Sequence, residues 1–353
     1  MNFSAFSTVT NLAVFFFSAG LVWYFGAKLS IYVDAIAVKT GISHGFLGAL
    51  LLGGITSLPE MATVGSASFQ GNAPLALNNL FGTIANNFLF LAFADVLVGR
   101  EALTSVVAQS FTLLQGVLSV LLLVFVGIAC TVPAPLWGHV STWSAGILAL
   151  FTFFMWLASR YPHRDPWVVR NETERHNTPQ GSRELPPKAD DQSTLKVAVR
   201  IAGAGFVVLV AGIFLAQTSD ALARQTGVSS GMVGMVLLAM ATGLPELSTT
   251  YTAVRIRRYE MALGNVFGTN LWNVAIVAFG DLLFREGAIY ESTGNFEILA
   301  IFRGIAATSI FLLGLLERKD KTLFRMGYDS LAVLFVYFGG IWLLYLVSGG
   351  SGT

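Results

Sequence analysis

Charged residues are scarce in this chain. Only 12% of its 353 residues are Asp, Glu, Lys or Arg, whereas 54% are hydrophobic and the mean hydropathy is +0.68. A typical soluble domain carries about 25% charged residues, because its surface must be solvated. The composition therefore excludes an ordinary soluble globular protein and indicates a membrane protein.

Cysteine and histidine are also rare. The single cysteine, Cys130, excludes an intrachain disulfide and a thiolate metal cluster, and the four histidines do not have metal-ligand spacing. The sequence contains no H-E-x-x-H motif, phosphate-binding loop or Ser/His/Asp arrangement, so nothing in it favours an enzyme. We therefore expect neither a catalytic site nor a bound cofactor.

Ten apolar stretches are long enough to cross a bilayer as helices, which takes about 20 residues each. They cover residues 9–33, 44–68, 72–98, 103–130, 138–159, 196–219, 229–254, 259–284, 296–316 and 327–348. Long continuous runs are typical of helices, whereas membrane strands alternate over shorter segments. The sequence therefore predicts an all-α polytopic protein with ten transmembrane helices in the lipid bilayer.

One polar segment interrupts the apolar pattern. Residues 160–195 contain prolines, acids and bases, so we expect a flexible linker between a first five-helix half, residues 1–159, and a second, residues 196–353. With this linker in the cytoplasm, 17 of the 21 Lys and Arg residues lie on the same side, as the positive-inside rule requires. Both termini would then lie outside, in what we expect to be a prokaryotic plasma membrane.

Four basic residues fall elsewhere. Arg224 and Arg285 lie on the outer side, while Lys28 and Arg303 fall inside predicted helices near their ends. For the latter two we expect the charged group to extend to the membrane interface along its aliphatic stem.

The two halves repeat each other in sequence. An internal alignment that places the second half on the first pairs GISHGFLGALLLGGITSLPEMAT (41–63) with GVSSGMVGMVLLAMATGLPELST (227–249) without a gap, and ALNNLFGTIANN (76–87) with ALGNVFGTNLWN (262–273). Because each half has an odd number of predicted helices, the copies would face opposite sides of the membrane. Inverted repeats of this kind are typical of secondary transporters, whose substrate site lies near the bilayer midplane.

Each repeat contains a proline followed by a glutamate deep in an apolar stretch. The runs are Thr56-Ser57-Leu58-Pro59-Glu60 and Thr242-Gly243-Leu244-Pro245-Glu246. Proline removes a backbone donor, so both helices should break here and leave carbonyl groups free. An ionised carboxylate at this depth costs about 2.5–3.5 kcal/mol, which a bound cation would offset. The alternative is a pair of protonated glutamates that only hold helices together.

The next helix of each repeat supplies a matching polar pair. Thr83 and Asn87 are four residues apart, as are Thr269 and Asn273, so each pair lies on one helix face. With Thr56, Thr242 and the two glutamates, all the ligand groups are oxygens, which favour a hard cation coordinated by six to eight of them. The formal charge of −2 could be balanced by one Ca²⁺, two Na⁺ or two protons, and this competition indicates an antiporter. An uncoupled cation channel is the alternative from another class.

These paired runs, TSLPE with GTIANN and TGLPE with GTNLWN, resemble the repeats of sodium/calcium exchangers, a branch of the cation/calcium antiporter superfamily. The resemblance covers nearly the whole chain. It implies ten helices, two inverted halves, external termini, a cytoplasmic loop after the fifth helix, and exchange of Ca²⁺ for Na⁺ by alternating access.

The resemblance also implies roles for individual residues. By this resemblance, Glu60 and Glu246 would be the carboxylates shared by Ca²⁺ and Na⁺, and Thr56, Thr242, Thr83 and Thr269 would be coordinating threonines. Gly53 and Ala239 would be small residues whose carbonyls bind Na⁺, and Asn87 and Asn273 would be a third polar pair. Two departures reduce the charge and oxygen count, since Asn273 stands where the family often has Asp and Gly243 where it has a hydroxyl residue. Exchange of Ca²⁺ for H⁺ therefore remains the alternative.

Two further pairs of acids recur in the internal alignment. Asp95 and Asp281 lie toward the ends of their helices, where helix-end hydrogen bonds or interfacial ion pairs are expected. Asp34 and Asp220 recur near the ends of the first and sixth predicted helices, and we interpret them as interfacial.

Overall fold

The computed structural model describes residues 3–98, 101–107, 110–160, 193–226, 239–317, 322–323 and 326–349. Its elements, in chain order, are η1 (Phe3–Ala5), α1 (Thr8–Thr40), α2 (His44–Leu47), η2 (Gly48–Leu52), α3 (Gly53–Thr56), α4 (Leu58–Phe69), α5 (Ala73–Asp95), α6 (Leu103–Val106), α7 (Ser110–Ala129), β1 (Leu136–Trp137), β2 (Val140–Ser141), α8 (Thr142–Arg160), α10 (Thr194–Thr226), α12 (Ala239–Thr242), α13 (Leu244–Arg255), α14 (Tyr259–Leu283), η5 (Ile289–Ser292), α15 (Asn295–Glu317), β3 (Thr322–Leu323), β4 (Met326–Gly327) and α16 (Tyr328–Gly349).

The predicted all-α membrane fold is confirmed. Within the described residues, eight single helices are long and apolar enough to span a bilayer, and the segment 44–69 adds a ninth span that is bent by 42° after Thr56. Most of the predicted linker lies outside the described residues, and so does part of the predicted span 229–254. The described part of that span begins at α12.

Several predicted boundaries are wrong. The first and sixth predicted helices were too short, since α1 and α10 are each 33 residues long. The predicted span 103–130 is divided, because α6 ends at Val106 and α7 begins only at Ser110. A short hairpin with two residues in each strand, β1–β2, overlaps the start of the predicted span 138–159 and precedes α8. A hairpin of the same size, β3–β4, precedes α16.

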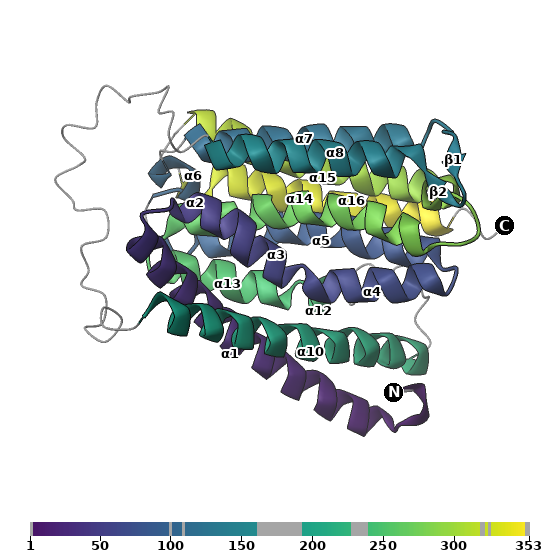
Figure 1. The fold of residues 1–353 in the computed structure, drawn as a ribbon, viewed down its shortest axis with the longest axis horizontal. Coiled ribbons are helices and arrows are strands. Elements are labelled where there is room, and N and C mark those ends of the chain that lie inside the picture. Colours follow the sequence, from purple (N-terminus) through teal and green to yellow (C-terminus); the bar gives the residue numbers. More distant parts are fainter. Residues whose placement is uncertain are drawn as a thin grey trace.

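The bounds of many elements recur in the internal alignment of the two halves. Helices α1 and α10 match end for end, as do α3 with α12, α4 with α13 and hairpin β1–β2 with β3–β4. Helices α1 and α10 pack side by side and run in opposite directions (Figure 1). These two sequence-equivalent helices thus cross the bundle antiparallel to each other.

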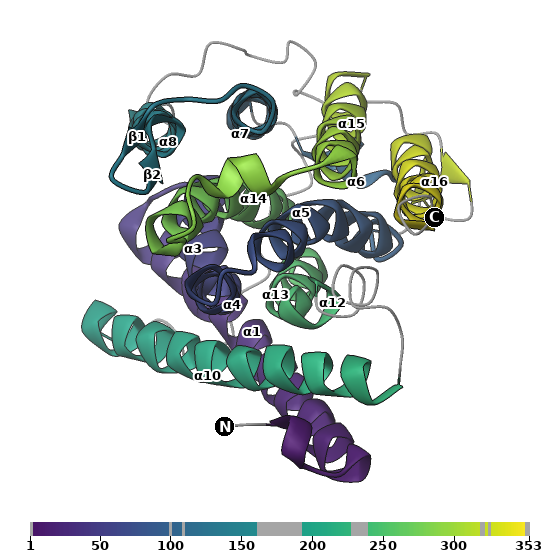
Figure 2. The same cartoon turned by 90° about the vertical axis from the view of Figure 1, so that its right-hand side faces the viewer.

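The helices form three layers (Figures 1 and 2). Helices α3, α4, α5, α13 and α14 lie in the centre, with α1 and α10 on one side and α7, α8, α15 and α16 on the other. The central position explains why α5 and α14 are 89% and 78% buried over their apolar windows, against 22% for α1. Proline-broken helices and their polar neighbours are therefore shielded from lipid.

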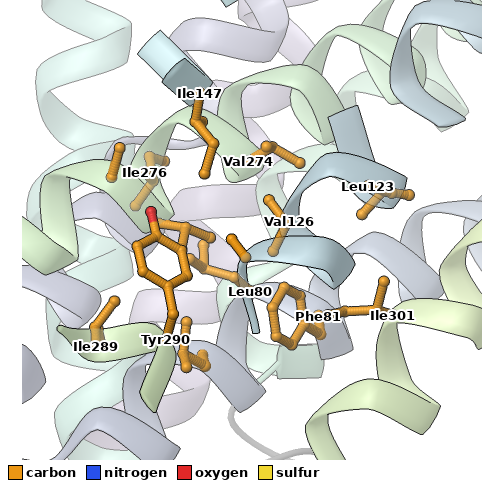
Figure 3. Packing of buried hydrophobic residues seen from close by; sticks show 14 of the residues in the cluster. Leu80, Phe81, Leu123, Val126, Ile147, Val274, Ile276, Ile289, Tyr290 and Ile301 are labelled. Carbon is orange, nitrogen blue, oxygen red and sulfur yellow. The ribbon is translucent and has the colours of Figure 1, made fainter. Parts of the chain in front are cut away.

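Apolar packing fixes the central layer against the α7–α8–α15 side. Tyr290, Leu80, Phe81, Ile147 and Val126 belong to one buried cluster drawn in Figure 3. Because lipid is as apolar as these side chains, the cluster stabilises the bundle through close contact rather than by removing surface from water.

The recurring acids Asp95 and Asp281 make the predicted helix-end hydrogen bonds, and both are fully buried. Each carboxylate accepts two backbone N–H bonds, one from the short helix that follows its own helix and one from a hairpin of the other half. The bonds are Leu103 N to Asp95 Oδ1 (2.6 Å), Gly327 N to Asp95 Oδ2 (2.6 Å), Ile289 N to Asp281 Oδ1 (2.9 Å) and Ser141 N to Asp281 Oδ2 (2.8 Å). These bonds satisfy backbone groups at helix ends and connect the two halves.

Asp34 links the outer layer to the centre. It lies near the end of α1, where it accepts hydrogen bonds from Nε of Arg258 at 2.5 Å and from the His44 ring at 2.8 Å. The side chain of its counterpart Asp220 lies outside the described residues.

The expectation that Arg303 extends to the interface is wrong. Its side chain is only 5% exposed and its guanidinium lies 5.4 Å from the Tyr337 ring centre, inside the bundle. Lys28 remains half-buried, with its ammonium near the ring of Tyr24.

Candidate ion-binding site

Both predicted helix breaks are present and nearly identical. Helix α3 ends at Thr56 and α4 begins at Leu58 with Pro59 in its first turn, where a missing N–H is tolerated. Helix α12 ends at Thr242, and α13 begins two residues later with Pro245 in the same place. A π-helical turn, η2, precedes the first break, and such turns widen a helix locally.

The breaks bring the two glutamates together in the centre of the protein. Glu60 and Glu246 are both fully buried, and their carboxylates are close enough to repel each other. Each faces the threonine of the other repeat, Thr242 beside Glu60 and Thr56 beside Glu246. None of the four carboxylate oxygens makes a hydrogen bond of good geometry to the described residues.

The threonines before each break are fully buried as well. Thr56 donates to the Leu52 carbonyl at 2.9 Å, and its oxygen lies 3.4 Å from the hydroxyl of Thr269 on α14. Thr242 lies 3.4 Å from the amide oxygen of Asn79 on α5. The hydroxyls therefore join each broken helix to the long helix of the opposite repeat.

Helices α5 and α14 contribute the polar pairs that the sequence predicted. Thr83 and Asn87 on α5 and Asn273 on α14 are all fully buried. Asn87 donates from its amide to Oδ1 of Asn270 at 2.8 Å, which leaves its own Oδ1 without a donor among the described residues. Neither polar atom of the Asn273 side chain has a described partner.

The two small residues occupy positions where helices touch. Ala239 is fully buried, and its carbonyl accepts the Gly243 N–H at 3.0 Å. The Gly53 carbonyl accepts both the N–H and the hydroxyl of Ser57, at 3.1 and 2.8 Å. A side chain at Gly53 would place its Cβ 2.8 Å from the backbone nitrogen of Thr269, so glycine permits this approach of α3 to α14.

Three buried asparagines near this site were not among the predicted ligands. Asn79 faces Thr242, Asn270 bonds Asn87, and Asn265 donates to Thr249 and Thr250 at 2.9 and 3.0 Å. Asn79 and Asn265 are equivalent in the internal alignment, so their recurrence in both repeats could have identified them as candidate site residues.

The donor set fits a hard cation. Buried carboxylates accept but cannot donate, so two of them without hydrogen-bond donors require a cation or protons nearby. Threonine hydroxyls and asparagine amide oxygens complete an all-oxygen environment, and among the described residues no group of three His, Cys, Asp or Glu side chains could form a transition-metal site.

Comparison with known proteins agrees with this chemistry. The family model described as "Sodium/calcium exchanger protein" matches residues 10–161 and 196–346, which is most of the chain. The chain belongs to this family. It is therefore a transporter of the cation/calcium antiporter type, and the matched regions contain both broken helices of the exchanger.

Two curated relatives cover most of the exchanger. The inner membrane protein YrbG of Escherichia coli K12 is 27% identical over 273 residues, with 76% of this chain and 78% of YrbG aligned. The putative antiporter CaxA of Alkalimonas amylolytica is 23% identical over 329 residues, with 92% and 95% aligned.

A solved structure has the same fold. The sodium-calcium exchanger NCX_Mj, in crystals soaked with Na⁺ and Sr²⁺, superposes with a TM-score of 0.70 over 95% of this exchanger and 98% of NCX_Mj, at 18% sequence identity. At that identity the likeness concerns the fold, so ligand positions must be argued from the residues of this chain.

Proposed function

We propose that this protein exchanges Ca²⁺ for Na⁺ across the membrane, with both ions bound between Glu60 and Glu246. The observation that carries the proposal is that two fully buried carboxylates, one from each repeat, lie among oxygen-bearing side chains and accept no hydrogen bond of good geometry from the part of the chain that the structure describes. A divalent cation neutralises their formal charge of −2, and two monovalent cations do so equally well. Each ion species therefore displaces the other, which is the requirement for countertransport.

Calcium is the favoured divalent substrate because of the ligand types. Thr56, Thr242, Thr83 and Thr269 offer hydroxyls, Asn87 and Asn273 offer amide oxygens, and Ala239 offers a carbonyl. The Gly53 carbonyl becomes a ligand when the Ser57 hydroxyl releases it. Ca²⁺ accepts six to eight oxygens in flexible geometry, whereas Mg²⁺ demands a compact octahedron and dehydrates reluctantly. The NCX_Mj crystals were soaked with Na⁺ together with Sr²⁺ or Ca²⁺, which supports the same class of ions.

Protons are the alternative coupling ion. Asn273 is neutral and lies at the centre of α14, so the two glutamates are the only acidic site residues proposed here. If the two glutamates bind either one proton each or one Ca²⁺ between them, the same fold would exchange Ca²⁺ for H⁺.

The topology that we propose places both termini outside a plasma membrane of the prokaryotic type. Helix α1 begins and α16 ends at one end of the bundle, whereas α8 ends and α10 begins at the other (Figure 1). Arg160 at the end of α8 and Arg255, Arg257 and Arg258 at the end of α13 belong to this second end, which is the cytoplasmic one by the positive-inside rule. The relative YrbG is described as an inner membrane protein, which supports this location.

Antiport and channel activity differ in whether Ca²⁺ needs a partner ion. Proteoliposomes preloaded with ⁴⁵Ca²⁺ and diluted into choline medium should retain it, because the empty site with charge −2 does not cross. External Na⁺, or Ca²⁺ itself, should release the label at least about tenfold faster. Rapid release into choline medium without a partner ion, together with single-channel currents, would instead identify an uncoupled channel.

A further inference from the structure

A hydrogen bond between two asparagines joins α5 to α14 beside the proposed ion site. Nδ2 of Asn87 donates to Oδ1 of Asn270 at 2.8 Å, and both side chains are fully buried. Because the nitrogen of Asn87 is held by this bond, the free atom of its amide is Oδ1, which has no donor among the described residues. A buried acceptor oxygen without a donor is suited to coordinate a cation.

Contacts between neighbouring residues place this pair beside the glutamates. Asn270 follows Thr269, whose hydroxyl lies 3.4 Å from that of Thr56. Thr56 in turn faces the carboxylate of Glu246. All of these side chains are fully buried. A short chain of contacts thus leads from Asn87 on α5 through α14 to one of the two acids.

The residue that supports Asn87 has no polar counterpart in the other repeat. Asn87 and Asn273 are equivalent in the internal alignment, and the equivalent of Asn270 is Ile84. The Ile84 side chain is buried in an apolar cluster and cannot accept a hydrogen bond from an amide. Both polar atoms of Asn273 are without a partner among the described residues. One amide of the equivalent pair is therefore held, and the other has no described hydrogen bond to hold it.

Holding the amide matters because its two ends act oppositely on a cation. The oxygen is an acceptor and can coordinate, whereas the NH₂ group is a donor and repels positive charge. Rotation about the last side-chain bond exchanges the two ends, and no described hydrogen bond opposes this rotation in Asn273. In Asn87 the same rotation would break the bond to Asn270 and turn two amide oxygens toward each other.

We propose that Asn270 is a positioning residue that fixes Oδ1 of Asn87 toward the bound cation, and that the two equivalent amides of the site are unequal as a result. This inference rests on the proposed function. Asn87 is oriented before an ion arrives, whereas Asn273 must be oriented by the ion itself, which reduces the net affinity that it supplies. Asn87 therefore contributes more to cation binding than its equivalent in the second repeat.

The test is equilibrium binding of ⁴⁵Ca²⁺ to detergent-purified protein. Asn270→Leu removes the acceptor but keeps a similar volume, so it should weaken Ca²⁺ binding about tenfold. Asn87→Ala should weaken binding by a similar factor, and Asn273→Ala by about threefold or less. In the Asn87→Ala background, Asn270→Leu should change the affinity by less than about twofold, because the group that Asn270 positions is already gone.

Asn270→Asp is the matched control, because a carboxylate keeps an acceptor oxygen at the same reach. Its Ca²⁺ affinity should not fall below that of wild type. Asn270→Ala replaces Asn270→Leu if the latter does not elute as a single species on size exclusion.

Three results would overturn the inference while wild-type binding still supported the proposed function. They are an unchanged affinity after loss of the acceptor at Asn270, losses that multiply in the double variant as a merely structural role predicts, and equal losses from Asn87→Ala and Asn273→Ala. A wild type that binds no Ca²⁺ would contradict both the inference and the proposed function.

Discussion

Glu246→Gln should abolish exchange and reduce Ca²⁺ affinity by at least about 100-fold. Glutamine keeps the size of the side chain but removes one of two negative charges from a fully buried site. A buried ion that loses one charged partner is destabilised by about 3–5 kcal/mol, which corresponds to a factor of 100 or more. Glu60→Gln should behave alike, because the two glutamates are equivalent in the internal alignment and face each other's threonines.

The measurement is ⁴⁵Ca²⁺ binding and uptake with purified, reconstituted protein. Glu291→Gln is the matched control, since Glu291 is an exposed acid in η5. It should bind and transport Ca²⁺ as wild type does. Full activity of Glu246→Gln would mean that the buried carboxylates only hold helices together.

Fixing α1 to α13 should stop turnover. We propose that α1 and α10, which form a layer of their own, slide across the central helices to open the site to either face (Figure 2). Helix α1 packs on α13 beside the second break, where Ser248 donates to the Trp23 carbonyl at 2.6 Å. A Cβ at Gly26 would lie 3.0 Å from Cβ of Ser248, and a disulfide needs about 3.5–4.5 Å between these atoms, so a small adjustment allows one.

The variant is Gly26→Cys with Ser248→Cys in a Cys130→Ser background, which is free of other thiols because Cys130 is the single cysteine. Oxidation should reduce exchange at least about tenfold, and reduction should restore it. The control joins α1 to α10 through Asn11→Cys and Gln225→Cys with a short bis-maleimide, since those side chains already bond at 3.3 Å. That link should leave exchange largely intact. Full exchange through the oxidised Gly26–Ser248 pair would contradict sliding.

The broken helices and the all-α fold could be predicted from sequence because their causes are local. Proline at 59 and 245 lacks an N–H, and the helices indeed restart with these prolines in the first turn. The internal alignment strengthened the prediction of the helix breaks, since a feature found twice at equivalent positions is rarely accidental. The ten ligand assignments remain predictions, and the glutamate variants above test two of them.

Features that depend on a partner helix could not be predicted. Hydropathy predicted that the first helix ends at residue 33, but α1 continues to Thr40, and Asp34 within it pairs with Arg258 and His44. Arg303 lies near a helix end in sequence, yet the direction of its side chain depends on the space beside Gly340 in another helix. Hairpins of two residues per strand are too short to show a periodic pattern.

The most direct test of the proposed function is ⁴⁵Ca²⁺ uptake into proteoliposomes under an outward Na⁺ gradient, and separately under an outward H⁺ gradient. We expect wild type to accumulate Ca²⁺ when Na⁺ drives it, and Glu246→Gln to accumulate none. Uptake driven by protons alone would replace Na⁺ with H⁺ as the coupling ion. Absence of Ca²⁺ uptake under both gradients would contradict the proposal that this exchanger carries calcium.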